Sequence, residues 1–154
     1  MIKLVILLFA FSCYCFVGCG VRKPVAQFQH ASVTQSTPEA FSLDVTFEVF
    51  NTNDEPLQLT MYTYVVTAGG EVVYEGLASA EQSVPRWSSV VSAIPIVFRR
   101  ESVVGKQQVA WNMEGTLGFI PPKAIAETLL DIGIWKPKTS VRAQGLVQVP
   151  ELDD

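Results

Sequence analysis

Residues 43–76 read LDVTFEVFNTNDEPLQLTMYTYVVTAGGEVVYEG, and this stretch decides the fold. Its first part alternates between apolar and polar residues. The apolar set is Leu43, Val45, Phe47 and Val49. Successive side chains of a strand point to opposite faces, so this alternation predicts a β-strand with one face buried.

A turn and a returning strand follow. Residues 51–56 read NTNDEP, where short polar side chains bond to their own backbone and Pro56 fixes φ, which is typical of a turn. The apolar residues of the return are Leu57, Leu59, Tyr62, Tyr64 and Val66. Their spacing shifts by one residue, which predicts a β-bulge near Met61. The Gly-Gly pair at 69–70 predicts a tight hairpin into a strand over 72–74, so one segment supplies three antiparallel strands.

The remainder of the chain continues the pattern of short strands. Residues 25–34 suit an edge strand with limited burial, and 77–86 is expected to cross to a second sheet. Further strands are expected at 88–100, 108–119 and 139–150. Pro95 cannot donate a ladder hydrogen bond, so its strand is expected at an edge or bulged there, and Trp111 is expected to anchor the core. One short helix is expected near 122–132.

These elements predict a mainly β fold in one domain. The chain has 154 residues, of which 49% are hydrophobic, enough for a single core. We expect an antiparallel β-sandwich of about seven strands over 24–150, similar to the immunoglobulin or fibronectin type III plan. Residues 151–154 form an acidic tail, for which we expect fraying.

Short motifs in this domain resemble the water-stress-and-hypersensitive-response (WHy) domain of the second group of late embryogenesis abundant (LEA) proteins. The matching residues are Asn51, Asn53, Pro56, Leu57, Leu59, Tyr62, Tyr64 and Gly76, with Gly145 in a similar terminal pattern. None of these residues is catalytic in character. The resemblance implies a β-sandwich and a protective function under water stress.

The first residues have the plan of an export signal. A short positive start precedes an uncharged apolar run over 4–18, which is shorter than the roughly 20 residues that span a membrane. We therefore expect a signal peptide over 1–18. The sequence Phe-Val-Gly-Cys at 16–19 resembles a bacterial lipobox, which implies diacylglycerol on Cys19 and a lipidated tether over 19–23. The alternatives are an ordinary signal peptide and a plain membrane anchor that contains cysteine.

The placement of cysteine agrees with lipid attachment. The three cysteines are Cys13, Cys15 and Cys19, so the domain itself contains none and no disulfide. Two or more acyl chains on one residue hold a protein stably on a bilayer. By resemblance to bacterial lipoproteins, Gly20 favours the outer membrane, and we expect an exported lipoprotein on its periplasmic face.

The composition offers little for catalysis or nucleic-acid binding. The net charge of −4, from 11 basic and 15 acidic residues, argues against nucleic acid as a partner. The adjacent pair Arg99-Arg100 is interpreted as a solvated strand end. The lone His30 is interpreted as a solvated side chain, and the carboxylates at 54–55 lack the ligand spacing of a calcium loop. We expect no metal, no cofactor and no enzymatic activity.

Three apolar side chains outside the predicted strands are candidates for contact with a partner. Trp87 falls in a polar loop, and Leu130 and Trp135 lie in or just after the predicted helix. One interpretation is that they cover the ends of the sandwich. The other is an apolar contact surface, because tryptophan in a loop supplies contact area at small entropic cost.

The sequence thus predicts a non-enzymatic, lipid-anchored envelope protein. Its resemblance to the WHy domain implies protection through binding of client proteins or membrane surfaces. Two alternatives remain open: a module that holds a lipid or other apolar ligand between sheet and helix, and a structural subunit of an envelope assembly. The oligomeric state is not predicted.

Overall fold

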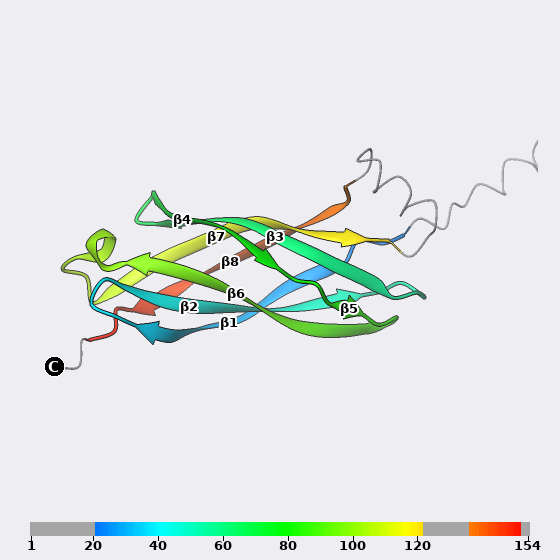
Figure 1. The fold of residues 1–154 in the computed structure, drawn as a ribbon, viewed down its shortest axis with the longest axis horizontal. Coiled ribbons are helices and arrows are strands. Elements are labelled where there is room, and N and C mark those ends of the chain that lie inside the picture. Colours follow the sequence, from blue (N-terminus) through cyan, green and yellow to red (C-terminus); the bar gives the residue numbers. More distant parts are fainter. Residues whose placement is uncertain (1–20, 122–135, 152–154) are drawn as a thin grey trace, which may run out of the picture.

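The computed structural model describes residues 21–121 and 136–151, which form two antiparallel sheets packed face to face (Figure 1). One sheet has three strands in the order β1–β2–β6, with bounds β1 Val25–Ser36, β2 Ala40–Asn51 and β6 Ser88–Arg99. The other has the order β4–β3–β7–β8, with bounds β3 Leu57–Ala68, β4 Glu71–Ser79, β7 Gln108–Ile120 and β8 Lys138–Gln148. A two-residue strand, β5 (Ser83–Val84), pairs with the start of β3. The predicted antiparallel sandwich is confirmed.

Strand β2 forms as its alternation predicts. Its inward residues are at most 1% exposed; they are Phe41, Leu43, Val45, Phe47 and Val49. Strand β1 pairs with β2 alone and is mostly exposed, which confirms the predicted edge strand. Because β2 lies between β1 and β6, its apolar face is covered only by the opposite sheet.

The chain changes sheet earlier than the sequence indicates. The expectation placed the first change at 77–86, after three consecutive strands. In the structure β2 and β3 belong to different sheets, so the chain already crosses over the end of the sandwich at 52–56. The alternation of β2 requires an apolar cover but does not name the strand that supplies it. A second crossing, from β4 through β5 to β6, confirms the one expected at 77–86.

The opposite sheet also follows the predicted pattern. The register of β3 against β7 shifts between Leu59 and Tyr62, which confirms the bulge near Met61 and leaves both flanking side chains fully buried. The hairpin at 69–70 has two glycines with φ of 63° and 88°, as expected. Trp111 on β7 is 3% exposed and confirms the expected core anchor.

An aromatic column joins the two layers. Phe28 packs edge-on against Phe47 and against Trp111, with ring centroids 6.1 Å apart in each case. Phe47 in turn stacks on Tyr62 at 6.5 Å. Such pairs add to the stabilisation that burial provides.

The sandwich is joined along one side by a hydrogen bond between its sheets. Tyr64 on β3 donates from its hydroxyl to the carbonyl oxygen of Pro95 on β6, at 2.5 Å. Strand β6 pairs only with β2, so Pro95 lies in an edge strand as predicted. Gly76 lies opposite Tyr64 on β4, and a Cβ there would stand 2.6 Å from Tyr64 Cζ. Burial, with Tyr74 alongside, raises the pKa of the Tyr64 phenol well above its usual range.

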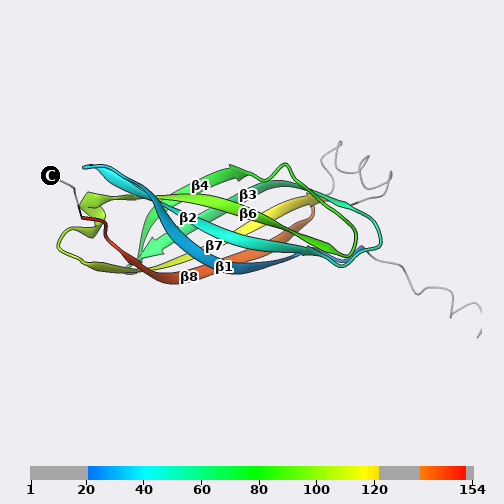
Figure 2. The same cartoon turned by 90° about the horizontal axis from the view of Figure 1, so that it is seen from below.

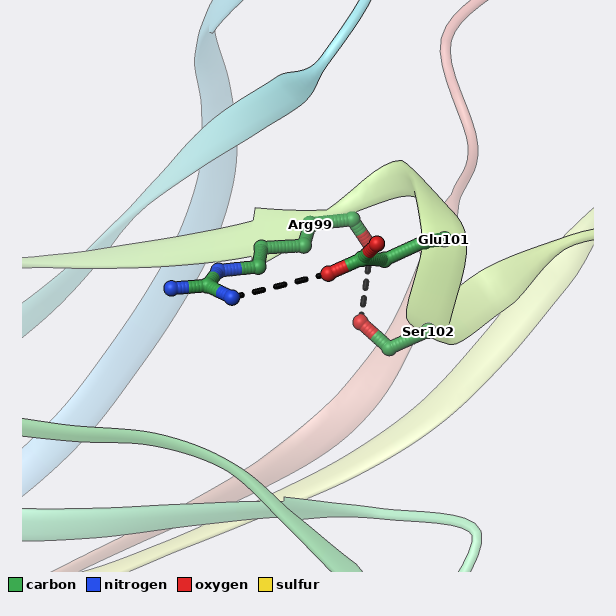
Figure 3. A network of polar contacts seen from close by, with 3 residues as sticks. All are labelled: Arg99, Glu101 and Ser102. Atoms are coloured by element: carbon green, nitrogen blue, oxygen red, sulfur yellow. Dashed lines mark hydrogen bonds and ion pairs between the residues drawn. The ribbon is translucent and has the colours of Figure 1, made fainter.

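The two basic residues at the end of β6 behave differently. Arg99 is exposed and pairs with Glu101 at 3.5 Å, while Ser102 donates to the Arg99 carbonyl (Figure 3). Arg100, in the 3₁₀ turn η2 (Arg100–Val103), donates hydrogen bonds of 2.7–2.8 Å to the Thr37 and Pro150 carbonyls and to the Ser36 hydroxyl. The interpretation as a solvated strand end therefore holds for Arg99 and is wrong for Arg100, whose planar guanidinium joins three segments.

The strands run along the length of the molecule, and the two views agree on its ends (Figures 1 and 2). We call the end at which the described chain begins the proximal end; it comprises 21–24, 52–56, 80–88, 119–121 and 136–138. The other, the distal end, comprises 36–40, 68–71, 99–108 and 148–151. The predicted helix at 122–132 lies outside the described residues, as do Leu130 and Trp135.

Gly76→Ala should destabilise the protein, because the new methyl group overlaps Tyr64 and Tyr74. We expect a loss of about 1–3 kcal/mol in unfolding free energy, measured by urea denaturation. The control is Ser79→Ala on the exposed face of the same strand, expected to stay within about 0.5 kcal/mol of the wild type. Equal stability of the two variants would contradict the close packing at Gly76.

Candidate functional site

Two buried asparagines organise the proximal end. Asn51 and Asn53 are 1% and 8% exposed, and they are the buried polar residues of the described chain. The Asn51 amide nitrogen donates to the carbonyl oxygens of Glu55, Val84 and Pro85 at 2.8, 3.1 and 3.2 Å. Asn51 therefore joins the end of β2 to the following turn and to β5.

Asn53 extends these bonds to the first described residues. Its backbone N–H and its side-chain amide both donate to Asn51 Oδ1, at 2.9 and 2.8 Å. Its side chain also pairs with the backbone of Arg22, accepting from the N–H at 2.8 Å and donating to the carbonyl at 2.9 Å. The Trp87 N–H donates to the Asn53 carbonyl at 3.2 Å. We call these bonds the asparagine network; it joins three segments that are distant in sequence, at Arg22, 51–55 and 84–87.

The network satisfies its buried polar groups, which would be costly if left unpaired. It also fixes Arg22, which the sequence places in the tether. Pro24, two residues later, is buried. The chain therefore enters the sandwich at a defined point of the proximal end.

The other motif residues lie apart from the network and serve packing. Leu57 and Tyr62 are fully buried in the core. Tyr64 on β3 bonds to β6 and packs against Gly76 on β4, as described above. Pro56 is exposed and ends the turn, and a Cβ on Gly145 would stand 3.3 Å from Trp111 Cζ2. The structure thus brings Asn51 and Asn53 together and distributes the rest through the sandwich.

Trp87 is exposed at the proximal end. Its side chain is 66% exposed, and its φ of 52° lies in the left-handed region that bulky residues seldom adopt. It borders a shallow pocket of about 320 Å³, whose other lining residues are Phe50, Asn51, Thr52, Ser88 and Ser89. The exposure is compatible with the predicted apolar contact, which stays a prediction.

Sequence reasoning missed a cluster of lysines at the same end. Lys23, Lys136 and Lys138 line a pocket of about 280 Å³ whose apolar lining is Val21, Phe119, Pro121 and Pro137. Lys23 is 113 positions from Lys136 (136 − 23), so no motif spacing indicates the cluster. Knowing that β1 and β8 begin at one end would have revealed it.

The residue types that bind metal ions do not cluster in the described part of the chain. No cluster of three or more His, Cys, Asp or Glu among them could hold a metal ion. His30 is exposed on β1. Burial raises the pKa of the Tyr62 phenol, whose hydroxyl has no hydrogen-bond partner among the described residues. Within the described ranges, no helix is long and apolar enough to cross a membrane.

Comparison with known proteins identifies the fold but no family. No protein-family model matches the chain, and no curated protein matches it in sequence. The solution structure of a putative late embryogenesis abundant (LEA) protein, At2g46140.1, is similar over 98% of this chain and 85% of that one, with 13% identity and a TM-score of 0.65. The solution structure of AT1g01470 from Arabidopsis thaliana is similar over 92% of this chain and 93% of that one, with 12% identity and a TM-score of 0.65.

A crystal structure of a protein from Archaeoglobus fulgidus is also similar. It covers 82% of this chain and 100% of that one, with 12% identity and a TM-score of 0.56. At such identities the likeness establishes a shared fold. The chain therefore has a β-sandwich fold similar to that of a putative LEA protein, and its WHy character stays a prediction.

Asn51→Ala should destabilise the protein, because three carbonyl groups and the Asn53 amide lose their partner together. We expect a loss of about 1–3 kcal/mol or more in unfolding free energy, measured by urea denaturation. Thr52→Ala, an exposed neighbour in the same turn, is the matched control and should change stability by less than about 0.5 kcal/mol. If both variants have the same unfolding free energy as the wild type, the network does not stabilise the fold.

Proposed function

We propose that the protein is a non-enzymatic, lipid-anchored envelope protein of the second LEA group, which protects proteins or membrane surfaces during water stress. The observation that carries this proposal is the fold shared with a putative LEA protein over nearly the whole chain. The motif residues at 51–57, which resemble a WHy domain, support it. Most of these motif residues pack inside the sandwich. We therefore assign contact with clients to other residues, on the surface.

The surface offers suitable contacts for partly dehydrated clients. Large apolar side chains stand exposed on both sheets, more than a third exposed in each case; examples are Met61, Val65, Leu77, Val91 and Leu146. They are interspersed with polar and charged neighbours on the same strands. Small apolar sites on a soluble surface can contact exposed apolar patches of a client without forming one permanent interface.

The point at which the N-terminal chain enters the sandwich is compatible with an anchor at Cys19. Arg22 is held by the asparagine network at the proximal end. Arg22 is three positions after Cys19, so extended geometry limits their Cα separation to about 11 Å. A lipid on Cys19 would therefore place the sandwich directly beside the bilayer with the proximal end nearest to it.

Lipidation can be tested in a bacterial host fed labelled palmitate. The full chain should be recovered labelled in the membrane fraction, and Cys19→Ser should remove the label, because the thiol is the attachment atom. Cys15→Ser is the matched control, four residues earlier in the apolar run, and should keep the label. An unlabelled wild type, or a Cys19→Ser variant that stays labelled, would exclude this anchor.

Protection can be tested by drying. The mature protein, mixed with a drying-sensitive soluble enzyme such as lactate dehydrogenase, should raise the activity recovered on rehydration. The reference is an unrelated β-sandwich of similar size and net charge at equal mass concentration. Equal recovery with the two proteins would refute protection as a specific property of this chain.

A second candidate is an apolar-ligand module, which the pocket at Phe119 and Pro137 favours. Its volume of about 280 Å³ lies near the lower end of the range for small-molecule sites, so it would admit only a small apolar group. Native mass spectrometry of the gently purified protein distinguishes the candidates. A co-purifying apolar ligand would favour the module, and its absence would favour protection.

A further inference from the structure

Three lysines meet at the proximal end beside apolar residues. Lys23 precedes β1, while Lys136 and Lys138 lead into β8, and all three line the pocket that includes Val21 and Phe119. None forms an ion pair with another described residue; the ion pairs in these ranges are Arg99–Glu101 and Arg142–Glu114. Lysine side chains beside apolar residues match an amphiphile with an anionic head.

Trp87 provides a second, independent observation at the same end. Its indole is exposed, and the Asn53 carbonyl fixes its backbone in the left-handed region. An exposed indole held on a rigid turn is suited to the polar–apolar boundary of a bilayer, where tryptophan is enriched. Arg86, the residue before it, is also exposed and adds positive charge.

The charge of the rest of the molecule makes this end distinctive. The chain as a whole carries −4, so an anionic surface repels it in most orientations. Acidic residues at the proximal end are Asp54, Glu55 and Glu81, on connections that flank the start of β3. Lys23, Lys136 and Lys138 lie where β1 and β8 begin, and Arg22 and Arg86 bring the basic residues of the proximal end to five against these three acidic ones. Attraction to an anionic surface therefore depends on presenting the proximal end.

We propose that the proximal end is a docking surface for a bilayer containing anionic phospholipids. Lys23, Lys136 and Lys138 contact the headgroups, and Trp87 enters the interfacial region. The proposal rests on the proposed anchor at Cys19 for bringing this end to the membrane. It adds that the sandwich is held against the bilayer in one orientation, with the distal end facing the aqueous phase.

Lysine labelling on vesicles tests this orientation. The full chain is mixed with vesicles of phosphatidylcholine alone or with about 30% phosphatidylglycerol, separated by flotation, and pulsed with a water-soluble amine reagent. Peptide mass spectrometry then gives the labelling rate of each lysine. Lys106, exposed at the distal end, is the internal control.

On anionic vesicles, labelling of Lys23, Lys136 and Lys138 should slow by about fivefold or more relative to neutral vesicles, since each lysine near an anionic leaflet contributes roughly that factor in affinity. The rate at Lys106 should change little. The double variant Lys136→Glu/Lys138→Glu should abolish the slowing at Lys23. Lys106→Glu, a charge reversal at the distal end, should preserve it.

Quenching by brominated lipid tests the indole. The comparison is made on a Trp135→Phe background; Trp111 is buried, so quenching of Trp135→Phe in excess of that of Trp87→Phe/Trp135→Phe reports Trp87. We expect such an excess on anionic vesicles. Equal quenching of the two proteins would show that Trp87 does not enter the bilayer and would contradict its place in the docking surface.

The outcomes separate the docking surface from the anchor. Flotation with both vesicle types but equal labelling of all four lysines would overturn docking and leave the anchor standing. Flotation with anionic vesicles alone, with protection of the three lysines, would support docking and contradict the anchor. Failure to float with either type would overturn both proposals.

Discussion

The hydrogen bonds of Asn51 hold together the end of the sandwich at which the chain changes sheet. The inner face of β2 is apolar from Phe41 to Val49 and is covered only by the opposite sheet, and the chain crosses between layers immediately after Asn51. Three backbone carbonyl groups, those of Glu55, Val84 and Pro85, lie around this crossing. The side-chain amide of Asn51 reaches all three, and Asn53 joins the same network to Arg22 and Trp87.

The asparagine network links the fold to the surface proposed for function. It fixes the point at which the N-terminal chain enters, and it holds the backbone from which Trp87 projects. The lysine pocket lies at the same end, because β1 and β8 both begin there. At the distal end Arg100 joins other segments through its guanidinium, so each end of the sandwich is held by one or two polar side chains.

Local pattern predicted most of the fold. The alternation at 43–49, the shift near Met61 and the glycine pair at 69–70 each reflect backbone geometry that neighbouring residues determine, and all appear as expected. The assignment of β2 and β3 to different sheets was not predicted, because strand pairing depends on contacts far apart in sequence. For the same reason the bonding of Arg100 and the convergence of Lys23 with Lys136 could not be read from spacing. Asn51 and Asn53 were found through a family resemblance, which did not reveal their bonding.

Amide hydrogen exchange, measured by NMR, tests the central claim about the asparagine network most directly. The N–H of Arg22 donates to Asn53 Oδ1 and the N–H of Asn53 donates to Asn51 Oδ1, both inside the network. Both amides should exchange as slowly as that of Phe47 in β2, because only opening of the sandwich exposes them. Exchange of either amide as fast as that of the exposed Thr52 would contradict the account.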